Sequence, residues 1–128
     1  LKLFDIIETV DREKLAKEIH LHFDNKVKTK SFFIQINTGS ESQKSGILPL
    51  ESDSFIQYCV NDLKLPVIGL MCIPPIAGDP SQYFKILAKI AISNNLKELS
   101  MGMSNDYECA ISNGATFVRI GSKIFSNN

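Results

Sequence analysis

Five short apolar runs alternate along the chain with longer segments whose apolar residues recur at helical spacing. Runs rich in β-branched and aromatic residues are typical of strands, whereas a spacing of three or four places side chains on one helix face. Because a helix separates each strand from the next, the pattern predicts parallel strands joined by right-handed crossovers. The strands are predicted at residues 4–10, 31–37, 67–73, 96–101 and 116–120, and the helices at residues 11–23, 50–63, 80–94 and 105–113.

Several of these elements carry local signals that sharpen the prediction. Asp79 is predicted to cap the third helix, with Pro80 as its first residue. Asn105 is predicted to cap the fourth helix, with Glu108 completing a capping box and Gly114 closing the helix. The third strand is apolar throughout, which predicts burial on both of its faces.

Composition narrows the class of protein. The chain has 128 residues and a formal net charge of zero, which suits one domain of about 100–150 residues and argues against a nucleic-acid-binding face. No apolar run reaches the ~18 residues of a membrane span, and the first residues do not form a signal peptide. We therefore expect one cytoplasmic domain, residues 1–128, with neither nucleic acid nor membrane as a partner.

Cysteine and histidine offer little chemistry. Cys59, Cys72 and Cys109 fit neither a metal clip nor a disulfide framework, so we expect buried or half-buried free thiols. His20 and His22 are either a metal pair or surface histidines near a helix C-terminus. Their spacing of two points the side chains in different directions, which favours the surface interpretation.

Two strand ends combine glycine and serine, in residues 98–106 and 116–122. Free backbone N–H groups converge at such ends, and the last two strands of an α/β barrel are the usual phosphate site. The glycines could instead serve only turns, Ser104 could only cap a helix, and Arg119 could only pair with Asp106 or Glu8. The polar loop at residues 38–46, with Glu41 and Lys44, leaves the same end of the sheet and either faces a ligand or is merely solvated.

Longer motifs occupy the same strand ends. They are Gln-Ile-Asn-Thr at 35–38 with Glu41, Gln-Lys-Ser-Gly-Ile at 43–47, Gly-Leu-Met-Cys-Ile-Pro-Pro at 69–75, Leu-Ser-Met-Gly-Met-Ser at 99–104 with Asp106, and Val-Arg-Ile-Gly-Ser at 118–122 with Ile124 and Phe125. With these motifs the chain resembles the C-terminal part of the pyridoxal phosphate homeostasis family (YggS/PROSC), single-domain (β/α)8 barrels similar to the N-terminal domain of alanine racemase.

The resemblance implies pyridoxal phosphate as cofactor, bound at the C-terminal mouth of the barrel. If the family's phosphate ligands are transferred to the matching positions of this sequence, Ser104 would supply a hydroxyl to the phosphate. Gly121 and Ser122 would supply backbone amides, and Ser122 a second hydroxyl. Arg119 would lie beside the pyridine nitrogen and keep it unprotonated, and Met103 would pack near the ring. A cofactor whose ring nitrogen stays unprotonated withdraws electrons less strongly. The resemblance therefore implies a non-catalytic carrier of vitamin B6 homeostasis.

The chain also departs from this family. The family's Schiff-base lysine and its surrounding segment lie on the first strands of the barrel, and neither occurs here; Lys44 is the nearest substitute. By the family's layout we expect a fragment holding strands four to eight, an incomplete barrel whose open strands a missing N-terminal half or a second copy would cover. The alternatives are an inert remnant or structural half-barrel, or a racemase-like enzyme using Tyr107, Cys72 and Glu41.

Overall fold

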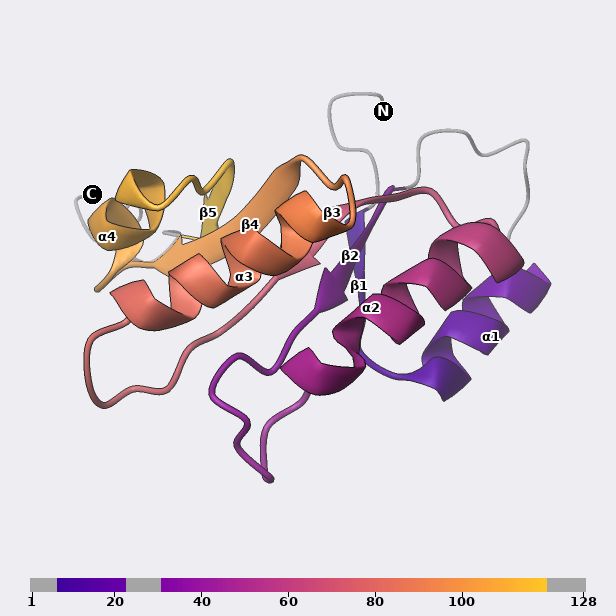
Figure 1. Ribbon diagram of the computed structural model, residues 1–128, viewed down its shortest axis with the longest axis horizontal. Helices are drawn as coiled ribbons and strands as arrows, with labels where there is room; N and C mark the ends of the chain where they lie inside the picture. Colours follow the sequence, from indigo (N-terminus) through magenta and orange to yellow (C-terminus); the bar gives the residue numbers. More distant parts are fainter. Residues whose placement is uncertain (1–6, 23–30, 120–128) are drawn as a thin grey trace, which may run out of the picture.

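The computed structural model describes residues 7–22 and 31–119, and all five of its strands join one parallel sheet in the order β1-β2-β3-β4-β5 (Figure 1). The strands are β1 (Ile7–Val10), β2 (Ser31–Gln35), β3 (Val67–Met71), β4 (Glu98–Met103) and β5 (Phe117–Arg119). Between them lie α1 (Glu13–His22), α2 (Pro49–Gln57) with its π-helical extension η2 (Tyr58–Asp62), α3 (Ser81–Ser93) and α4 (Tyr107–Ser112). The α/β class and the alternating order are as the sequence predicts.

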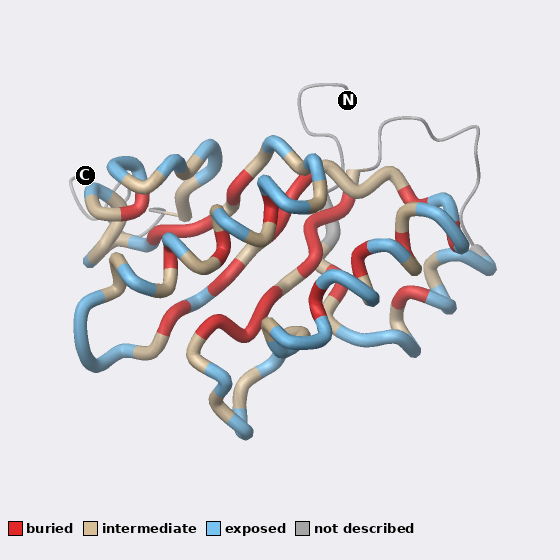
Figure 2. The backbone as a smooth tube through the Cα atoms, viewed as in Figure 1, coloured by how far each residue is buried: buried red, intermediate tan, exposed pale blue. Residues whose placement is uncertain are grey.

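One face of the sheet carries the helices and the core (Figures 1 and 2). Side chains alternate along each strand, so Phe32 and Ile34 of β2 point to the same face and are fully buried. Leu70 is the register partner of Ile34, and Leu99 that of Leu70, so all three contribute to a single buried cluster. Burial of these apolar side chains against α2, α3 and α4 stabilises the alternation.

The other face is lined by the intervening residues, and the sheet curves towards it. Phe33 of β2 and Phe117 of β5 meet edge to face, with ring centroids 5.4 Å apart. In a flat sheet these two strands would lie about 14 Å apart, since each strand spacing is about 4.8 Å. The sheet must therefore bend strongly, as a sector of a barrel wall does.

The third strand departs from its predicted burial. Leu70 is fully buried, but Val67, Ile68 and Met71 are only half-buried. The prediction of burial on both faces was wrong for these positions. Met71 follows the buried Leu70 and so points to the face that the described helices leave uncovered, whereas Val67 packs against the core cluster but is only partly covered by it.

The helix starts also differ in detail. The third helix begins at Ser81, one residue later than predicted, and its N-cap residue is Pro80 and not the predicted Asp79. Asp79 still supports the helix start, because its Oδ1 accepts the Ser81 N–H at 3.0 Å. The capping box predicted at Asn105 and Glu108 was wrong: the N-cap residue of α4 is Asp106. A tight turn, in which the Asp106 N–H donates to the Met103 carbonyl at 3.1 Å, delays the helix by one residue. Gly114 closes α4 as expected, with a φ of 100°.

The cysteines are free, with Cys59 and Cys72 buried and Cys109 half-buried, as predicted. His20 lies on α1 with its Nδ1 2.9 Å from the Leu63 carbonyl oxygen, a contact that fastens α1 to the end of η2. No group of three or more potential metal ligands occurs among the described side chains.

Candidate functional site

The polar residues singled out in the sequence gather at the carboxyl ends of β2 to β5. In a parallel α/β sheet this edge is where ligands bind, because helix N-termini and strand-end loops converge there. Three loops, residues 36–47, 72–80 and 103–106, and the side chain of Arg119 form this edge.

The Arg119 side chain is anchored at this edge by two hydrogen bonds. Its Nη1 donates to Ser100 Oγ at 2.6 Å, and its Nη2 donates to the Cys72 carbonyl oxygen at 3.1 Å. Burial lowers the pKa of the guanidinium, and this is opposed by Cys72 and Asp106, which raise it. An arginine keeps its charge through such a shift.

Arg119 forms no ion pair within 4.0 Å among the residues that the structure describes, although the more distant Asp106 carboxylate favours its charged form. Both of its anchors are neutral, so they orient the guanidinium without cancelling its charge. The alternative that Arg119 forms an ion pair with Asp106 is wrong; the Glu8 side chain lies outside the described part of the chain. Residues of the described part of the chain accept from two of the five N–H groups of this guanidinium, so within that part the other donors are open to a ligand.

Gly102 lies at an irregularity in β4, just before the predicted ring-packing residue Met103. Between the pairs Ser100–Phe117 and Met103–Arg119, β4 holds one residue more than β5, a bulge of the kind that re-aims side chains next to sites. Gly102 has a φ of 103°, and a Cβ there would lie 2.6 Å from the Ala110 Cβ. Glycine is therefore required for α4 to pack against this strand end.

Asp106 holds the turn that follows. Its Oδ1 accepts the Met103 N–H at 2.7 Å, which fixes the backbone where the strand leaves the sheet. Met103 is 41% exposed and, with Pro74, Pro75 and Asp106, lines a hollow of about 270 Å³. The structure thus places Met103 at the mouth, on the strand next to Arg119.

Ser104 lines a neighbouring hollow of about 470 Å³. Asp79, Asp106 and Glu108 border the same hollow, and three carboxylates make it a poor place for a phosphate dianion. A phosphate held by Ser104 would have to lie on the other side of this residue, towards the end of β5. Gly121 and Ser122, the other predicted phosphate ligands, lie outside the described residues.

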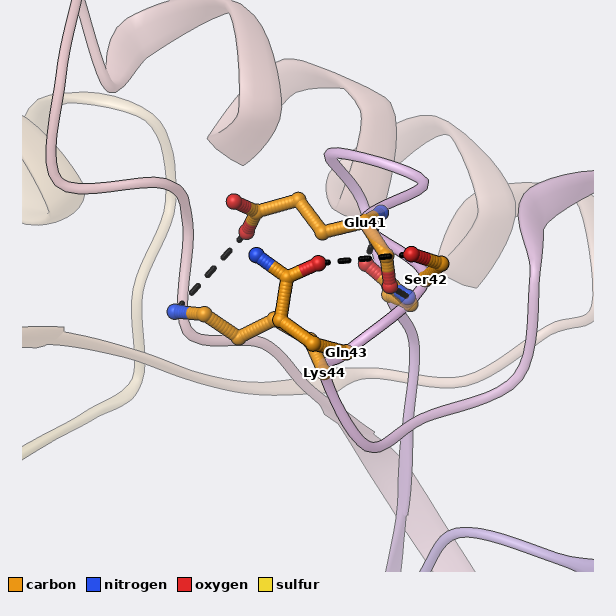
Figure 3. Close-up of polar contacts among 5 residues, drawn as sticks. Glu41, Ser42, Gln43 and Lys44 are labelled. Atoms are coloured by element: carbon orange, nitrogen blue, oxygen red, sulfur yellow. Dashed lines mark hydrogen bonds and ion pairs between the residues drawn. The ribbon is translucent and has the colours of Figure 1, made fainter.

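The loop at residues 38–46 is held by its own hydrogen bonds (Figure 3). Asn37 Nδ2 donates to the Glu41 carbonyl at 2.7 Å, and the Glu41 N–H donates to Asn37 Oδ1 at 3.1 Å. Lys44 Nζ lies 3.8 Å from Glu41 Oε1, and an ammonium held in an ion pair is a poor amine nucleophile. Gly39 lets this loop approach the next one, because a Cβ there would lie 2.5 Å from Pro75 Cγ.

The side chains proposed for an acid–base site do not form one. Burial raises the pKa of Cys72 to about 12, opposed by its contacts with Thr38 and Arg119, so its thiol stays protonated and inert. The Thr38 contact is weak, since the buried Thr38 Oγ1 makes no hydrogen bond of ordinary geometry with the described residues. Glu41 pairs with Lys44, and Tyr107 lies on α4 beside the Ser104 hollow.

Sequence reasoning missed the groups that hold the site together. Ser100 and the Cys72 carbonyl anchor Arg119, and neither carried a local signal, because both contacts join different strands. The two hydrogen bonds between Asn37 and Glu41 were detectable, since an asparagine that follows a strand, two residues before a glycine, is typical of a side-chain-stabilised turn.

Within the described ranges, no helix is long and apolar enough to span a bilayer.

Comparisons with known proteins identify the family of this chain. The family described as "Alanine racemase, N-terminal domain" matches residues 1–128. A pyridoxal phosphate homeostasis protein from Aquifex aeolicus is 36% identical over 130 residues, which cover 94% of this chain and 57% of the relative. The chain thus spans about half the length of the curated relatives it matches.

Two solved proteins share the fold. The crystal structure of an unknown protein from Bifidobacterium adolescentis superposes with a TM-score of 0.77 at 30% identity, over 91% of this chain and 51% of that one. PipY of Synechococcus elongatus superposes with a TM-score of 0.73 at 25% identity without pyridoxal phosphate, over 91% of this chain and 59% of PipY. Its form with pyridoxal phosphate bound superposes at 0.67 over 91% and 58%.

Proposed function

Because the chain belongs to the alanine racemase N-terminal domain family, we propose that it is the cofactor-mouth portion of a pyridoxal phosphate-binding protein of vitamin B6 homeostasis. The proposed role is to bind the cofactor without catalysis. Relatives named pyridoxal phosphate homeostasis proteins, and the PipY structure with pyridoxal phosphate bound, support this choice of ligand.

The observation that carries the proposal is the state of Arg119. A half-buried guanidinium that is oriented by two neutral acceptors, and whose other N–H groups have no acceptor among the described residues, favours a ligand that brings an acceptor or a negative charge. A pyridine nitrogen is such an acceptor. Pyridoxal phosphate supplies an aldehyde that reacts with amines and a ring that withdraws electrons, most strongly when its nitrogen is protonated. A permanently charged arginine at that nitrogen keeps it unprotonated, which favours carriage over catalysis.

The remaining contacts follow from the strand ends. In this proposal Met103 packs against the ring, and Ser104, Gly121 and Ser122 hold the phosphate through hydroxyl and amide donors. Because three carboxylates line the hollow on one side of Ser104 and would repel a phosphate, we propose that the phosphate lies on the β5 side of this residue.

The described residues represent, in this proposal, strands four to eight of the barrel. Further strands, supplied by an N-terminal half or by a second copy, would pair with the open edges of the sheet. We place the protein in the cytoplasm, where its thiols would stay reduced.

The test uses two ligands, so that binding is separated from amine chemistry. Deoxypyridoxine phosphate lacks the aldehyde and reports on the mouth alone, whereas pyridoxal phosphate followed by borohydride and intact mass reports any lysine adduct. We expect reversible binding of both ligands and no site-specific adduct.

Arg119→Met should weaken both ligands about 10–100-fold, the value of a hydrogen bond to a charged group. Lys97→Met is the control, because Lys97 is an exposed cation directly before β4 and so lies at the amino-terminal edge of the sheet, opposite the edge that holds Arg119. A folded chain that binds neither ligand would contradict the proposal, as would equal effects of the two substitutions. A stoichiometric adduct at Lys44 would contradict the absence of covalent attachment.

A further inference from the structure

We propose that Ser100 is a positioning residue that aims Arg119 at the ring nitrogen of the ligand. This inference rests on the function proposed above and deepens it, because it assigns recognition of the ring nitrogen to a side chain that does not itself touch the ligand.

The register of the sheet places Ser100 where it can do this. Ser100 pairs with Met71 of β3 on one side and with Phe117 of β5 on the other. Its neighbours Leu99 and Met101 are buried on the helix face, so Ser100 points to the opposite face by alternation. Arg119 lies two residues after Phe117 and therefore points to the same face.

The two anchors determine the orientation of the guanidinium. Ser100 Oγ accepts from Nη1 at 2.6 Å, and the Cys72 carbonyl oxygen accepts from Nη2 at 3.1 Å. The guanidinium is planar, so acceptors at both terminal nitrogens define its plane and thereby fix the directions of the remaining N–H groups. With only the Cys72 carbonyl left, the group could rotate about that one contact.

The chemistry of the anchor matters as much as its position. A carboxylate at residue 100 would hold the guanidinium more strongly but would also satisfy its charge, and a ligand would then compete with it. The Ser100 hydroxyl accepts a hydrogen bond and adds no charge. The arginine is thus oriented while its charge is kept for the ligand.

A purely structural role for Ser100 is the competing explanation, since the two contacts also tie β3, β4 and β5 together. The two roles differ in one respect. A structural role would affect every ligand of the mouth equally, whereas a positioning role affects only ligands that carry the ring nitrogen.

The experiment compares deoxypyridoxine phosphate with its deaza analogue, in which C–H replaces the ring nitrogen. Binding of each ligand to the chain is measured by calorimetry for the wild type, Ser100→Ala, Ser100→Cys and Ser100→Thr. Ser112→Ala is the matched control, because it also removes a serine hydrogen bond, from Ser112 Oγ to the Glu108 carbonyl at 3.1 Å, on the exposed side of α4. Far-UV circular dichroism checks that each variant is folded.

We expect the wild type to prefer the pyridine ligand about tenfold, the size of one hydrogen bond to a charged donor. Ser100→Ala and Ser100→Cys should remove this preference and leave the affinity for the deaza analogue unchanged. Ser100→Thr, which keeps the hydroxyl, and Ser112→Ala should retain the preference.

Three results would overturn the inference. One is a wild type that binds both ligands equally, and another is a Ser100→Ala variant that loses both to the same degree. The third is a Ser100→Ala variant that keeps the full preference. A folded wild type that binds neither ligand would instead refute the proposed function, and with it the role of Ser100.

Discussion

Replacing Gly102 by alanine tests whether the strand end at the mouth depends on a glycine. Gly102 has a φ of 103°, a region that L residues rarely adopt, and the added Cβ would lie 2.6 Å from the Ala110 Cβ and 3.2 Å from the Tyr107 Cα. The variant must therefore strain the backbone and push α4 away from β4.

The magnitude has two parts. The positive φ costs about 1–2 kcal/mol, and forcing a methyl group into occupied space costs about 1–3 kcal/mol more. We therefore expect Gly102→Ala to lower the free energy of unfolding by about 2–5 kcal/mol. Gly78→Ala is the matched control, since Gly78 also has a positive φ, 91°, but nothing lies within 4 Å of its Cβ position. The free energy of unfolding of Gly78→Ala should fall only by the cost of the positive φ.

The assay is urea unfolding followed by far-UV circular dichroism, with the midpoint and slope compared among variants. Alanine narrows the unfolded ensemble equally at both positions, so this effect cancels in the comparison. Adding Ala110→Gly to Gly102→Ala removes the closest contact and should recover part of the loss, a coupling of about 0.5–3 kcal/mol. Equal losses at residues 102 and 78, or no coupling with residue 110, would refute the reasoning.

Two further predictions concern the same edge and the core beneath it. Asp106→Ala removes the acceptor of the Met103 N–H and should lower the free energy of unfolding by about 1–2 kcal/mol, whereas Asp106→Asn keeps an oxygen there and should lose less; identical losses in urea unfolding would contradict this. Burial raises the pKa of Cys59 and of Cys72 from 9.0 to about 12, so both thiols ionise first in the unfolded chain. Their contribution to stability is complete below about pH 9 and is lost as pH rises towards about 12, by up to about 1.4 kcal/mol per pH unit per thiol. Unfolding measured across this range should show a shallower decline in Cys72→Ala than in the wild type, and parallel declines would rule the explanation out.

The order of elements followed from local pattern alone. Two local signals were enough: the apolar run at residues 31–37 and the helical spacing of apolar residues in 80–94. Both depend only on residues close together in the sequence, so they could be recognised without knowledge of the fold. Boundaries shifted by one or two residues where a turn competed with a helix, as at Asp106. Residues 1–6, 23–30 and 120–128 lie outside the described part, so the predictions for those ends stay predictions.

The candidate site was predictable in location but not in construction. Glycine and serine at the strand ends indicated that the site lies at the carboxyl edge of the sheet. The motifs at residues 99–104 and 118–122 resemble those of a known family, and this resemblance indicated pyridoxal phosphate as the ligand. The sequence contains the carboxylates that lie beside Ser104, but it does not show that they line one hollow. Asp79 and Glu108 come from different parts of the chain, and only the fold brings them together. Sequence reasoning left open whether Arg119 pairs with a carboxylate, and the structure shows neutral anchors in the described residues.

The sequence by itself determined which segments become strands and helices and that the strands run parallel, since these properties arise from residues close along the chain. Only the tertiary structure decided that Arg119 reaches the Cys72 carbonyl, 47 residues away, and rests on Ser100 between them. That contact depends on strand register, on the bulge at Gly102 and on the curvature that brings Phe33 against Phe117. Such features are set by the packing of the whole sheet, and no local pattern of residues encodes them.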